Sequence, residues 1–312
     1  MKVYSGLKDF SAKNPVVTIG MFDGLHAGHR ALLNEVIKKA REMNGESVII
    51  SFWPHPRIVL NKDADNLRFL TSLEEKTKLF SETGIDHLVL IPFTKEFASL
   101  TAREFILNIL VEGIKLKHLV IGYDHRFGKD RASSQEEFYK LAGEHGFTIS
   151  KVEEVDFEGQ HISSSTIRNL ILKGRIREAN KLLSYNYLLS GRVIGGQKLG
   201  RTIGYPTANI QPQEPRKLIP PDGVYACLVH ILGETHGGML NIGYRPTLKT
   251  GQKQRSIEVH ILDFEKDIYS EETTIEFIER IRDEKKFKDI GQLKEQLKKD
   301  EHTVRKVLNS IK

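Results

Sequence analysis

The sequence predicts two domains of different class. We expect an α/β domain with a Rossmann-like parallel sheet, followed by an antiparallel β-barrel or sandwich with a C-terminal helix. In the first half, apolar runs alternate with helical patterns, whereas Gly, Pro and Asn clusters separate short β-favouring segments in most of the second half. Helical periodicity returns at residues 293–311. The pattern changes near residues 184–188, so the expected domains are residues 1–184 and 185–312.

Short and almost continuous apolar runs predict the strands of the first domain, as is typical of parallel strands covered on both faces. These runs are Val16–Ile19, Val48–Phe52, Leu88–Ile91, Leu119–Ile121 and Ile149–Glu153. Candidate capping boxes mark the starts of the helices between them. The boxes are Thr71-x-x-Glu74, Thr101-x-x-Glu104 and Ser133-x-x-Glu136. Ligands of such sheets bind at the carboxyl ends of the strands.

In the second half, turn-forming clusters separate segments that alternate or carry β-favouring residues. The clusters are Gly195-Gly196, Pro206, Pro220–Gly223, Gly237-Gly238, Gly243 and Pro246. The clearest strands are Val224–Val229, Ser256–Leu262 and Thr273–Ile281. Many short strands of this kind predict an antiparallel barrel or sandwich.

The composition indicates a cytoplasmic protein with no membrane partner. The apolar runs are too short to span a bilayer, and the first residues lack the apolar centre of a signal peptide. The single cysteine, Cys227, excludes an internal disulfide framework and is expected in the core. The net charge of +6 could indicate nucleic-acid binding, but the basic excess near the end is mixed with acids at helical spacing. We therefore favour a solvated helix face over a nucleic-acid partner.

The segment Thr18–His29 follows the first predicted strand and opens the first predicted helix. Its glycines let the backbone approach a ligand, and a helix N-terminus favours an anion. His26 and His29 could donate hydrogen bonds to phosphate oxygens. A metal site and two incidental surface histidines are the alternatives. The metal site is less favoured because no Glu lies between the histidines.

The tetrapeptide His26-Ala27-Gly28-His29 resembles the His-x-Gly-His signature of the nucleotidyltransferase superfamily. Residues 162–168, Ile-Ser-Ser-Ser-Thr-Ile-Arg, resemble its second signature, although Ser165 stands where Thr is usual. Serines at a helix start beside an arginine would form a second anion clamp, while the alternative is a simple N-cap. The resemblance implies catalytic roles for both histidines. It also implies ATP contacts from Gly20, Phe22, Asp23, Gly28, Ser163, Ser164, Ser165 and Arg168.

Two further segments, residues 51–56 and 121–128, resemble segments of bacterial FAD synthetases. The resemblance implies flavin contacts from His55, Pro56, Asp124, Arg126 and Phe127. The sequence departs from the family at His125, where Phe is common, and at Met21, where Asn or Tyr is common. These departures bear on flavin affinity and not on the reaction class.

Residues 195–202 nearly fit a P-loop, but the following Ile-Gly-Tyr-Pro breaks helices, so the P-loop is rejected. Residues 200–209 instead resemble the riboflavin kinase signature, whose core is Pro-Thr-Ala-Asn. The resemblance implies that Thr207 and Asn209 hold Mg²⁺ on ATP, and that Glu258 is the general base. Without the resemblance, Glu258 would be an exposed carboxylate on an alternating strand. The implied ATP contacts of this domain are Gly195, Gly200, Arg201, Gly204 and Pro206.

The resemblance covers nearly the whole chain and is to the bifunctional bacterial riboflavin kinase/FAD synthetases. It implies that riboflavin and ATP give FMN, and that FMN and ATP give FAD and pyrophosphate, both with Mg²⁺. Three alternatives stay open: a single live site, a different acceptor such as a pantetheine phosphate or nicotinamide mononucleotide, and a flavin-binding regulatory protein. The sequence does not predict an oligomeric state.

Overall fold

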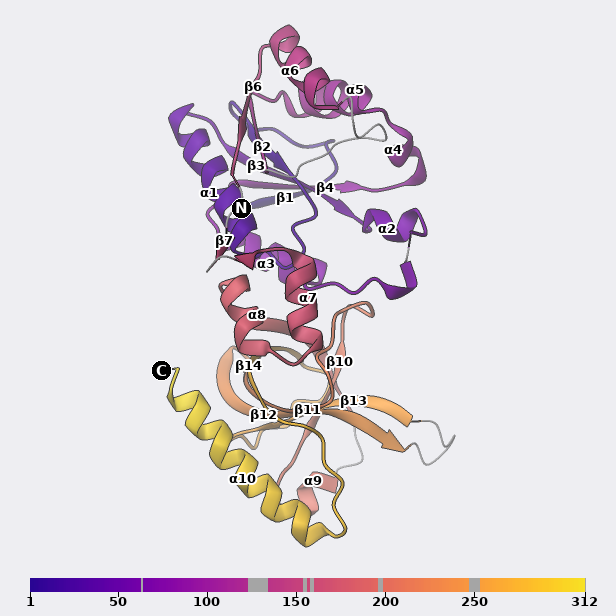
Figure 1. Cartoon of the computed structure of the whole chain (residues 1–312), viewed down its shortest axis with the longest axis vertical. Helices are drawn as coiled ribbons and strands as arrows, with labels where there is room; N and C mark the ends of the chain where they lie inside the picture. Colours follow the sequence, from indigo (N-terminus) through magenta and orange to yellow (C-terminus); the bar gives the residue numbers. More distant parts are fainter. Residues whose placement is uncertain are drawn as a thin grey trace. The chain divides into compact units, whose positions relative to one another are not determined.

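The computed structural model describes residues 1–62, 64–122, 134–153, 156–157, 160–195, 199–246 and 253–311 (Figure 1). The chain forms two compact units. The first unit comprises Met1–Arg68 and Lys76–Ser163, and the second comprises Phe69–Glu75 and Ser164–Lys312. The domain limits at residues 1–184 and 185–312 stay a prediction. No helix in the described part of the chain has the length and apolar character needed to cross a membrane.

A six-stranded parallel sheet in the order β1-β4-β3-β2-β5-β6 forms the centre of the first unit. Its strands are β1 Lys2–Ser5, β2 Val16–Ile19, β3 Ser47–Trp53, β4 His87–Pro92, β5 His118–Ile121 and β6 Thr148–Lys151. The helical elements are α1 Ala27–Glu42, α2 Pro56–Val59, the 3₁₀ helix η1 Ala64–Asn66, α3 Leu73–Ser81, α4 Lys95–Ser99, α5 Ala102–Glu104, the π-helical η2 Phe105–Ile114 and α6 Ser134–His145. A short hairpin follows, with β7 Asp156–Phe157 and β8 Gln160–His161. The predicted α/β class is confirmed, and each of the five predicted strands forms.

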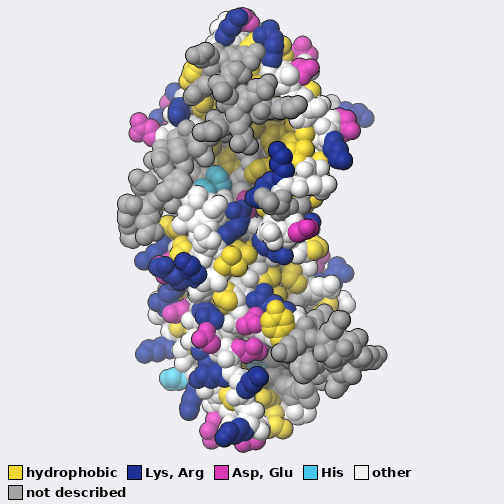
Figure 2. Space-filling view, turned by 45° about the vertical axis from the view of Figure 1, so that its right-hand side comes forward, with side chains coloured by type: hydrophobic (Ala, Val, Ile, Leu, Met, Phe, Trp, Pro, Cys, Tyr) yellow, Lys and Arg dark blue, Asp and Glu magenta, His cyan; other side chains and the backbone are white. Residues whose placement is uncertain are grey.

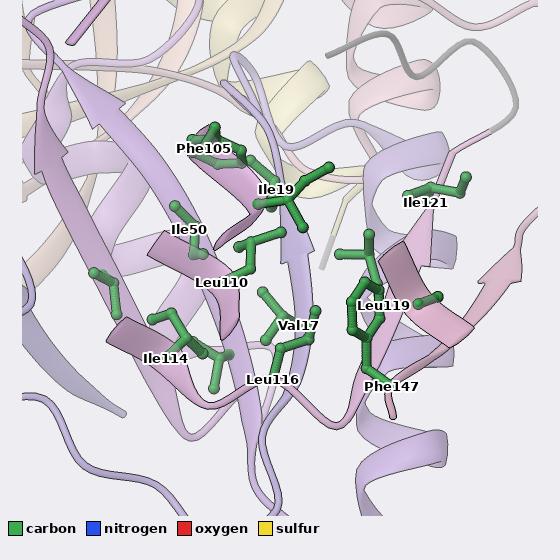
Figure 3. Close-up of a cluster of buried hydrophobic side chains, with 14 of the residues drawn as sticks. Val17, Ile19, Ile50, Phe105, Leu110, Ile114, Leu116, Leu119, Ile121 and Phe147 are labelled. Carbon is green, nitrogen blue, oxygen red and sulfur yellow. The ribbon is translucent and has the colours of Figure 1, made fainter. Parts of the chain in front are cut away.

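The core of this unit lies between the sheet and η2. Alternate residues of the strands, such as Val17 and Ile19, point into one cluster with Phe105 and Leu110 of η2 (Figure 3). Helix α1 packs on β2, β3 and β5 with its own apolar stripe, which includes Leu33. Because both faces of the sheet are covered, the carboxyl ends of the strands are left to bind ligands.

Two of the predicted capping boxes can be compared with the structure. The box at Thr101 and Glu104 forms as predicted. The box at Thr71-x-x-Glu74 is wrong by one residue, because Ser72 and Glu75 cap α3 instead: Ser72 N donates to Glu75 Oε2, and Glu75 N donates to Ser72 Oγ. Ser133 lies outside the described residues.

The second unit is built on a closed barrel in the order β10-β13-β12-β11-β14-β9, so the predicted antiparallel class is confirmed as a barrel. Its strands are β9 Tyr187–Ile194, β10 Ala208–Pro212, β11 Gly223–Ile231, β12 Glu234–Pro246, β13 Lys253–Ile261 and β14 Glu272–Arg282. The helices are α7 Ser164–Leu172, α8 Ile176–Leu183, α9 Leu199–Thr202 and α10 Ile290–Asn309. Helix α10 packs on β11, β12 and β14, and the half-buried Arg282 of β14 forms a bidentate pair with the buried Asp300 of α10.

Gly237 and Gly238 were expected to separate strands, but both lie inside β12. A Cβ atom on Gly237 would lie 2.7 Å from Leu308 Cδ1 of α10, and one on Gly238 would lie 2.8 Å from Cys227 Sγ. The glycines therefore allow close packing and do not mark a turn. Cys227 is buried as predicted, and burial raises the pKa of its thiol.

A buried ion pair holds the segment Phe69–Glu75 in the second unit. Lys217 Nζ donates to Glu75 Oε2 at 2.5 Å and to Leu70 O at 2.6 Å, and it lies 4.4 Å from the centroid of the Tyr187 ring. The other carboxylate oxygen of Glu75 accepts the N–H of Ser190 at 2.7 Å. Both charged side chains are 1% exposed, so each depends on the other for its solvation.

We expect Lys217→Met to lower the free energy of unfolding of the second unit by about 3–5 kcal/mol, because Glu75 would then be a buried charge without its cation. Urea unfolding followed by loss of the second unit's ellipticity would measure the change. The double variant Glu75→Gln/Lys217→Met should recover most of the loss. If the free energy of unfolding of Lys217→Met were within about 1 kcal/mol of the wild-type value, Lys217 would not be the cation that stabilises the buried Glu75.

Candidate active sites

The first candidate site is the turn between β2 and α1. Gly20 N donates to Ile50 O at 3.0 Å as the chain leaves the sheet. Phe22 and Leu25 then adopt left-handed conformations, with φ of 49° and 33°, and both side chains are buried. A Cβ atom on Gly20 would lie 3.0 Å from the Phe22 ring, so the glycine leaves room for that ring. Strained residues of this kind concentrate at functional sites.

The two predicted histidines meet at the N-terminus of α1. His26 is the N-cap, and its Nδ1 accepts the backbone N–H of His29 at 3.4 Å. The rings are stacked, with centroids 3.6 Å apart, and Phe22 packs edge-on against His29. Because His26 Nδ1 is an acceptor, a neutral His26 carries its proton on Nε2, the atom that can donate to a phosphate oxygen. Gly28 fits closely here, since its Cβ would lie 3.3 Å from His26 Nδ1.

Burial keeps His29 neutral. The pKa of His29 lies well below its usual value, first because of burial, then because of the neighbouring His26 and the positive charge of Lys76. The Nδ1 atom of His29 is buried and has no hydrogen-bond partner among the described residues. A buried nitrogen without a partner at a helix N-terminus is a place where a polar ligand atom would be stabilised.

Lys76, on α3, was not predicted as a site residue. Its side chain is buried, and Nζ donates to Met21 O at 2.9 Å within the turn. Burial lowers the pKa of Lys76, and the carboxylate of Asp23, which is also buried, opposes that shift. In the sequence, Lys76 reads as one of many helical lysines, since only the fold brings α3 to the turn.

Aromatic side chains gather where β3 and β4 end. Phe52 lies 5.8 Å from Phe93 and 5.6 Å from Phe97 between ring centroids, and Phe97 contacts Phe105 at 6.0 Å. His55 caps α2 nearby in the chain, accepting the N–H of Arg57 on Nδ1. Phe52 belongs to the segment 51–56 that resembles FAD synthetases, whereas Phe93 and Phe97 were not predicted, although Phe93 falls at the end of an apolar run.

Some of the predicted flavin and ATP contacts cannot be placed in this unit. Asp124, His125, Arg126 and Phe127 lie outside the described residues. Pro56 begins α2, and Ser163 is half-buried at the end of the first unit.

The other serines of the predicted clamp belong to the second unit, where α7 begins at Ser164. Ser164 and Arg168 are half-buried, and Ser165 is exposed. This agrees with the predicted helix start. Whether these residues bind ATP stays a prediction.

The second candidate site lies on the barrel around Glu258. Glu258 is 4% exposed, so the alternative of an exposed carboxylate is wrong. Ser256 Oγ donates to its Oε1 at 2.9 Å, and Thr207 Oγ1 donates to its Oε2 at 3.3 Å. Asn209 on β10 and Asn241 on β12 both pair with Glu258 across the barrel strands. Directly opposed residues of antiparallel strands share a face, so two hydroxyls, two amides and a carboxylate lie together.

A pocket of about 360 Å³ adjoins this cluster. Pro206 and Thr207 line it together with Phe264–Tyr269, a segment that was not predicted to belong to the site. The predicted ATP contact Gly200 closes the preceding turn: Tyr205 N donates to Gly200 O at 2.8 Å, and a Cβ on Gly200 would lie 2.1 Å from Tyr205 O.

The other predicted ATP contacts of the barrel are only partly placed. Gly204 has a φ of 84°, Gly195 is exposed at the end of β9, and Pro206 lines the pocket. The side chain of Arg201 lies outside the described residues. Helix α9 ends at Thr202, after only four residues, and no long helix of the P-loop type follows residues 195–202.

Comparisons with known proteins cover both units. Residues 9–166 match the FAD synthetase family, and residues 183–308 match the riboflavin kinase family. Proteins named bifunctional riboflavin kinase/FMN adenylyltransferase are similar over almost their full length. One from Listeria monocytogenes is 39% identical over 94% of this chain and 92% of its own. One from Escherichia coli is 37% identical over 100% and 99%, and one from Bacillus subtilis is 35% identical over 98% and 96%.

One solved structure also aligns with nearly the whole chain. It comes from Streptococcus pneumoniae and is described as a macrolide-efflux protein. It is 34% identical, with a TM-score of 0.86 over 97% of this chain and 98% of that one.

Proposed function

The chain belongs to the family of bifunctional riboflavin kinase/FMN adenylyltransferases, and from this premise we propose how its residues divide the two reactions. The riboflavin kinase half transfers the γ-phosphoryl group of ATP to riboflavin and releases FMN and ADP. The FAD synthetase half joins the FMN phosphate to the adenylyl group of a second ATP, giving FAD and pyrophosphate.

For adenylyl transfer, the stacked pair His26 and His29 binds the triphosphate. A phosphate oxygen of FMN attacks the α-phosphorus of ATP, the bond to the β-phosphate breaks, and pyrophosphate leaves. The role of the protein is therefore to orient both reactants and to stabilise charge on the phosphate oxygens. The geometry that supports this role is two stacked imidazoles at a helix N-terminus, with His29 kept neutral by burial. Each neutral ring carries one N–H that can donate to a phosphate oxygen.

For phosphoryl transfer, Glu258 accepts the proton of the ribityl 5′-hydroxyl as that oxygen attacks the γ-phosphorus. The carboxylate fits this role because it is buried and is oriented by Ser256 and Thr207. The oxygen donors Thr207 and Asn209 beside Glu258 fit a hard divalent cation, and we assign them to Mg²⁺. When bound, the ion would neutralise charge on the ATP phosphates.

Two apolar surfaces fit the ring systems of the substrates. The cluster of Phe52, Phe93 and Phe97, at the carboxyl ends of parallel strands, fits the isoalloxazine ring of FMN. In the barrel, the pocket between Pro206 and Tyr269 fits the adenine of ATP. We therefore place a flavin at the first surface and a nucleotide at the second.

We propose a cytoplasmic enzyme whose partners are flavins and ATP, with neither a membrane nor a nucleic acid among them. On the face that Figure 2 shows, Lys and Arg side chains are scattered among Asp and Glu. Mixed charge of this kind does not suggest the single-sign stripe of a nucleic-acid-binding surface. The net charge of +6 is instead consistent with phosphorylated small-molecule substrates.

A time course tests the whole scheme. We expect purified protein with riboflavin, ATP and Mg²⁺ to give FMN first and FAD later, and we expect excess EDTA to stop both steps because each uses a metal-bound nucleotide. Chromatography of the flavins provides the measurement, and heat-inactivated protein provides the control. FMN alone would contradict the adenylyl-transfer site. Flavin binding without any product would favour a regulatory protein.

A further inference from the structure

Lys76 is a buried cation that none of the roles above uses. Its side chain is 3% exposed. Lysine is almost never buried to this extent unless its charge has a purpose or a partner, because removing an ammonium group from water is costly. A methionine has nearly the same length and would fill the space without that penalty. The charge at this position therefore needs an explanation.

The hydrogen bond of Lys76 goes to the backbone of the nucleotide-binding turn. Nζ donates to Met21 O at 2.9 Å. Met21 lies between Gly20, which is bonded to the sheet through Ile50, and Phe22, which has a φ of 49°. A non-glycine residue stays in that conformation only where the surroundings hold it. The hydrogen bond from Lys76 of helix α3 is one of the contacts that hold the turn in this conformation.

Lys76 interacts electrostatically with two residues of the nucleotide-binding turn and helix start, Asp23 and His29. The carboxylate of Asp23, in the turn, stabilises the ammonium group against its burial. Lys76 in turn acts on His29, whose ring stacks on His26 at the start of α1. A positive charge behind this turn adds to the helix N-terminus in attracting a polyanion.

We propose that Lys76 is a positioning residue for adenylyl transfer. It fixes the Gly20–Leu25 turn through the Met21 carbonyl, and it places a buried positive charge behind the histidines where the triphosphate binds. The proposal rests on the adenylyl-transfer role given above to His26 and His29. Lys76 acts through the turn and through His29, and it makes no covalent bond.

The test compares Lys76→Met and Lys76→Arg with Lys78→Met, a change of an exposed lysine on the same helix. We expect Lys76→Met to lower the kcat of FAD formation about 10- to 100-fold and to raise the KM for ATP. FMN formation by the same protein should stay within about twofold, and the melting temperature should not fall, because a buried charge has been replaced by an apolar group. Lys78→Met should match the wild type.

The pH profile separates positioning from a purely structural role. Removing the positive charge of Lys76 raises the pKa of His29, so the acid limb of FAD formation should move to higher pH in Lys76→Met. Lys76→Arg keeps the charge and should keep the wild-type limb. Unchanged kcat, KM and acid limb in Lys76→Met would overturn the proposal. So would a parallel loss of FMN and FAD formation with a lower melting temperature in both variants. A wild type that makes FMN but no FAD would instead refute the adenylyl-transfer site itself.

Discussion

The variant His29→Ala should lose FAD formation by about 10³-fold, while FMN formation by the same protein continues at the wild-type rate. His29 stacks on His26 at the helix N-terminus. Removing a donor aimed at developing negative charge commonly reduces kcat by two to three orders of magnitude. The loss should appear in kcat rather than only in the KM for ATP, since the bond is strongest in the transition state.

The measurement supplies FMN and ATP directly and follows FAD by chromatography. His145→Ala is the matched control, because His145 is an exposed histidine in the last turn of α6 in the same unit. We expect this control to be indistinguishable from wild type. FAD formation by His29→Ala at more than about a tenth of the wild-type rate would show that His29 has no catalytic role.

The variant Glu258→Gln should show the opposite pattern, with FMN formation reduced about 10²- to 10⁴-fold and FAD formation from supplied FMN unaffected. Glutamine has the shape of glutamate and can still accept the Ser256 hydroxyl on its amide oxygen. It cannot take up a proton. The change therefore removes the base and leaves the surrounding network nearly intact.

The rate of FMN formation from riboflavin and ATP provides the measurement. Glu272→Gln is the control, because Glu272 is an exposed strand carboxylate of the same barrel. If Glu258→Gln phosphorylated riboflavin as fast as this control, the buried carboxylate would have a structural role only, and another base would have to be found.

The sequence was sufficient for the fold class and for the residues on local motifs. Continuous apolar runs such as Val16–Ile19 identify a buried parallel strand without any knowledge of its neighbours. His26 and His29 are three residues apart on one helix start, so their meeting follows from local geometry. Thr207 and Glu258 are 51 residues apart in the sequence. Without the structure, only the family resemblance indicates that they belong to one site, and the pairing of β10 with β13 explains why they meet.

Residues whose environment depends on distant segments could not be predicted. Lys76 has the sequence context of a surface helix, and its burial depends on the turn 55 residues earlier. The capping box of α3 was placed one residue too early because Glu74 and Glu75 are equivalent in the local pattern. Only Glu75 pairs with Lys217, which lies 142 residues away in the sequence, and this contact distinguishes it from Glu74. Gly237 and Gly238 were predicted to form a turn because the sequence does not show that α10 packs against this part of the barrel.

The pair Glu75 and Lys217 also bears on the order in which the chain can fold during its synthesis. The segment Phe69–Glu75 leaves the ribosome with the first unit but belongs to the second. At about 5–20 residues per second, the 142 residues to Lys217 take roughly 7 to 28 s to translate. Until then, Glu75 can satisfy its carboxylate only locally, through Ser72 and water. We therefore expect this short stretch to reach its final environment only after the barrel has been synthesised, although it is itself synthesised early.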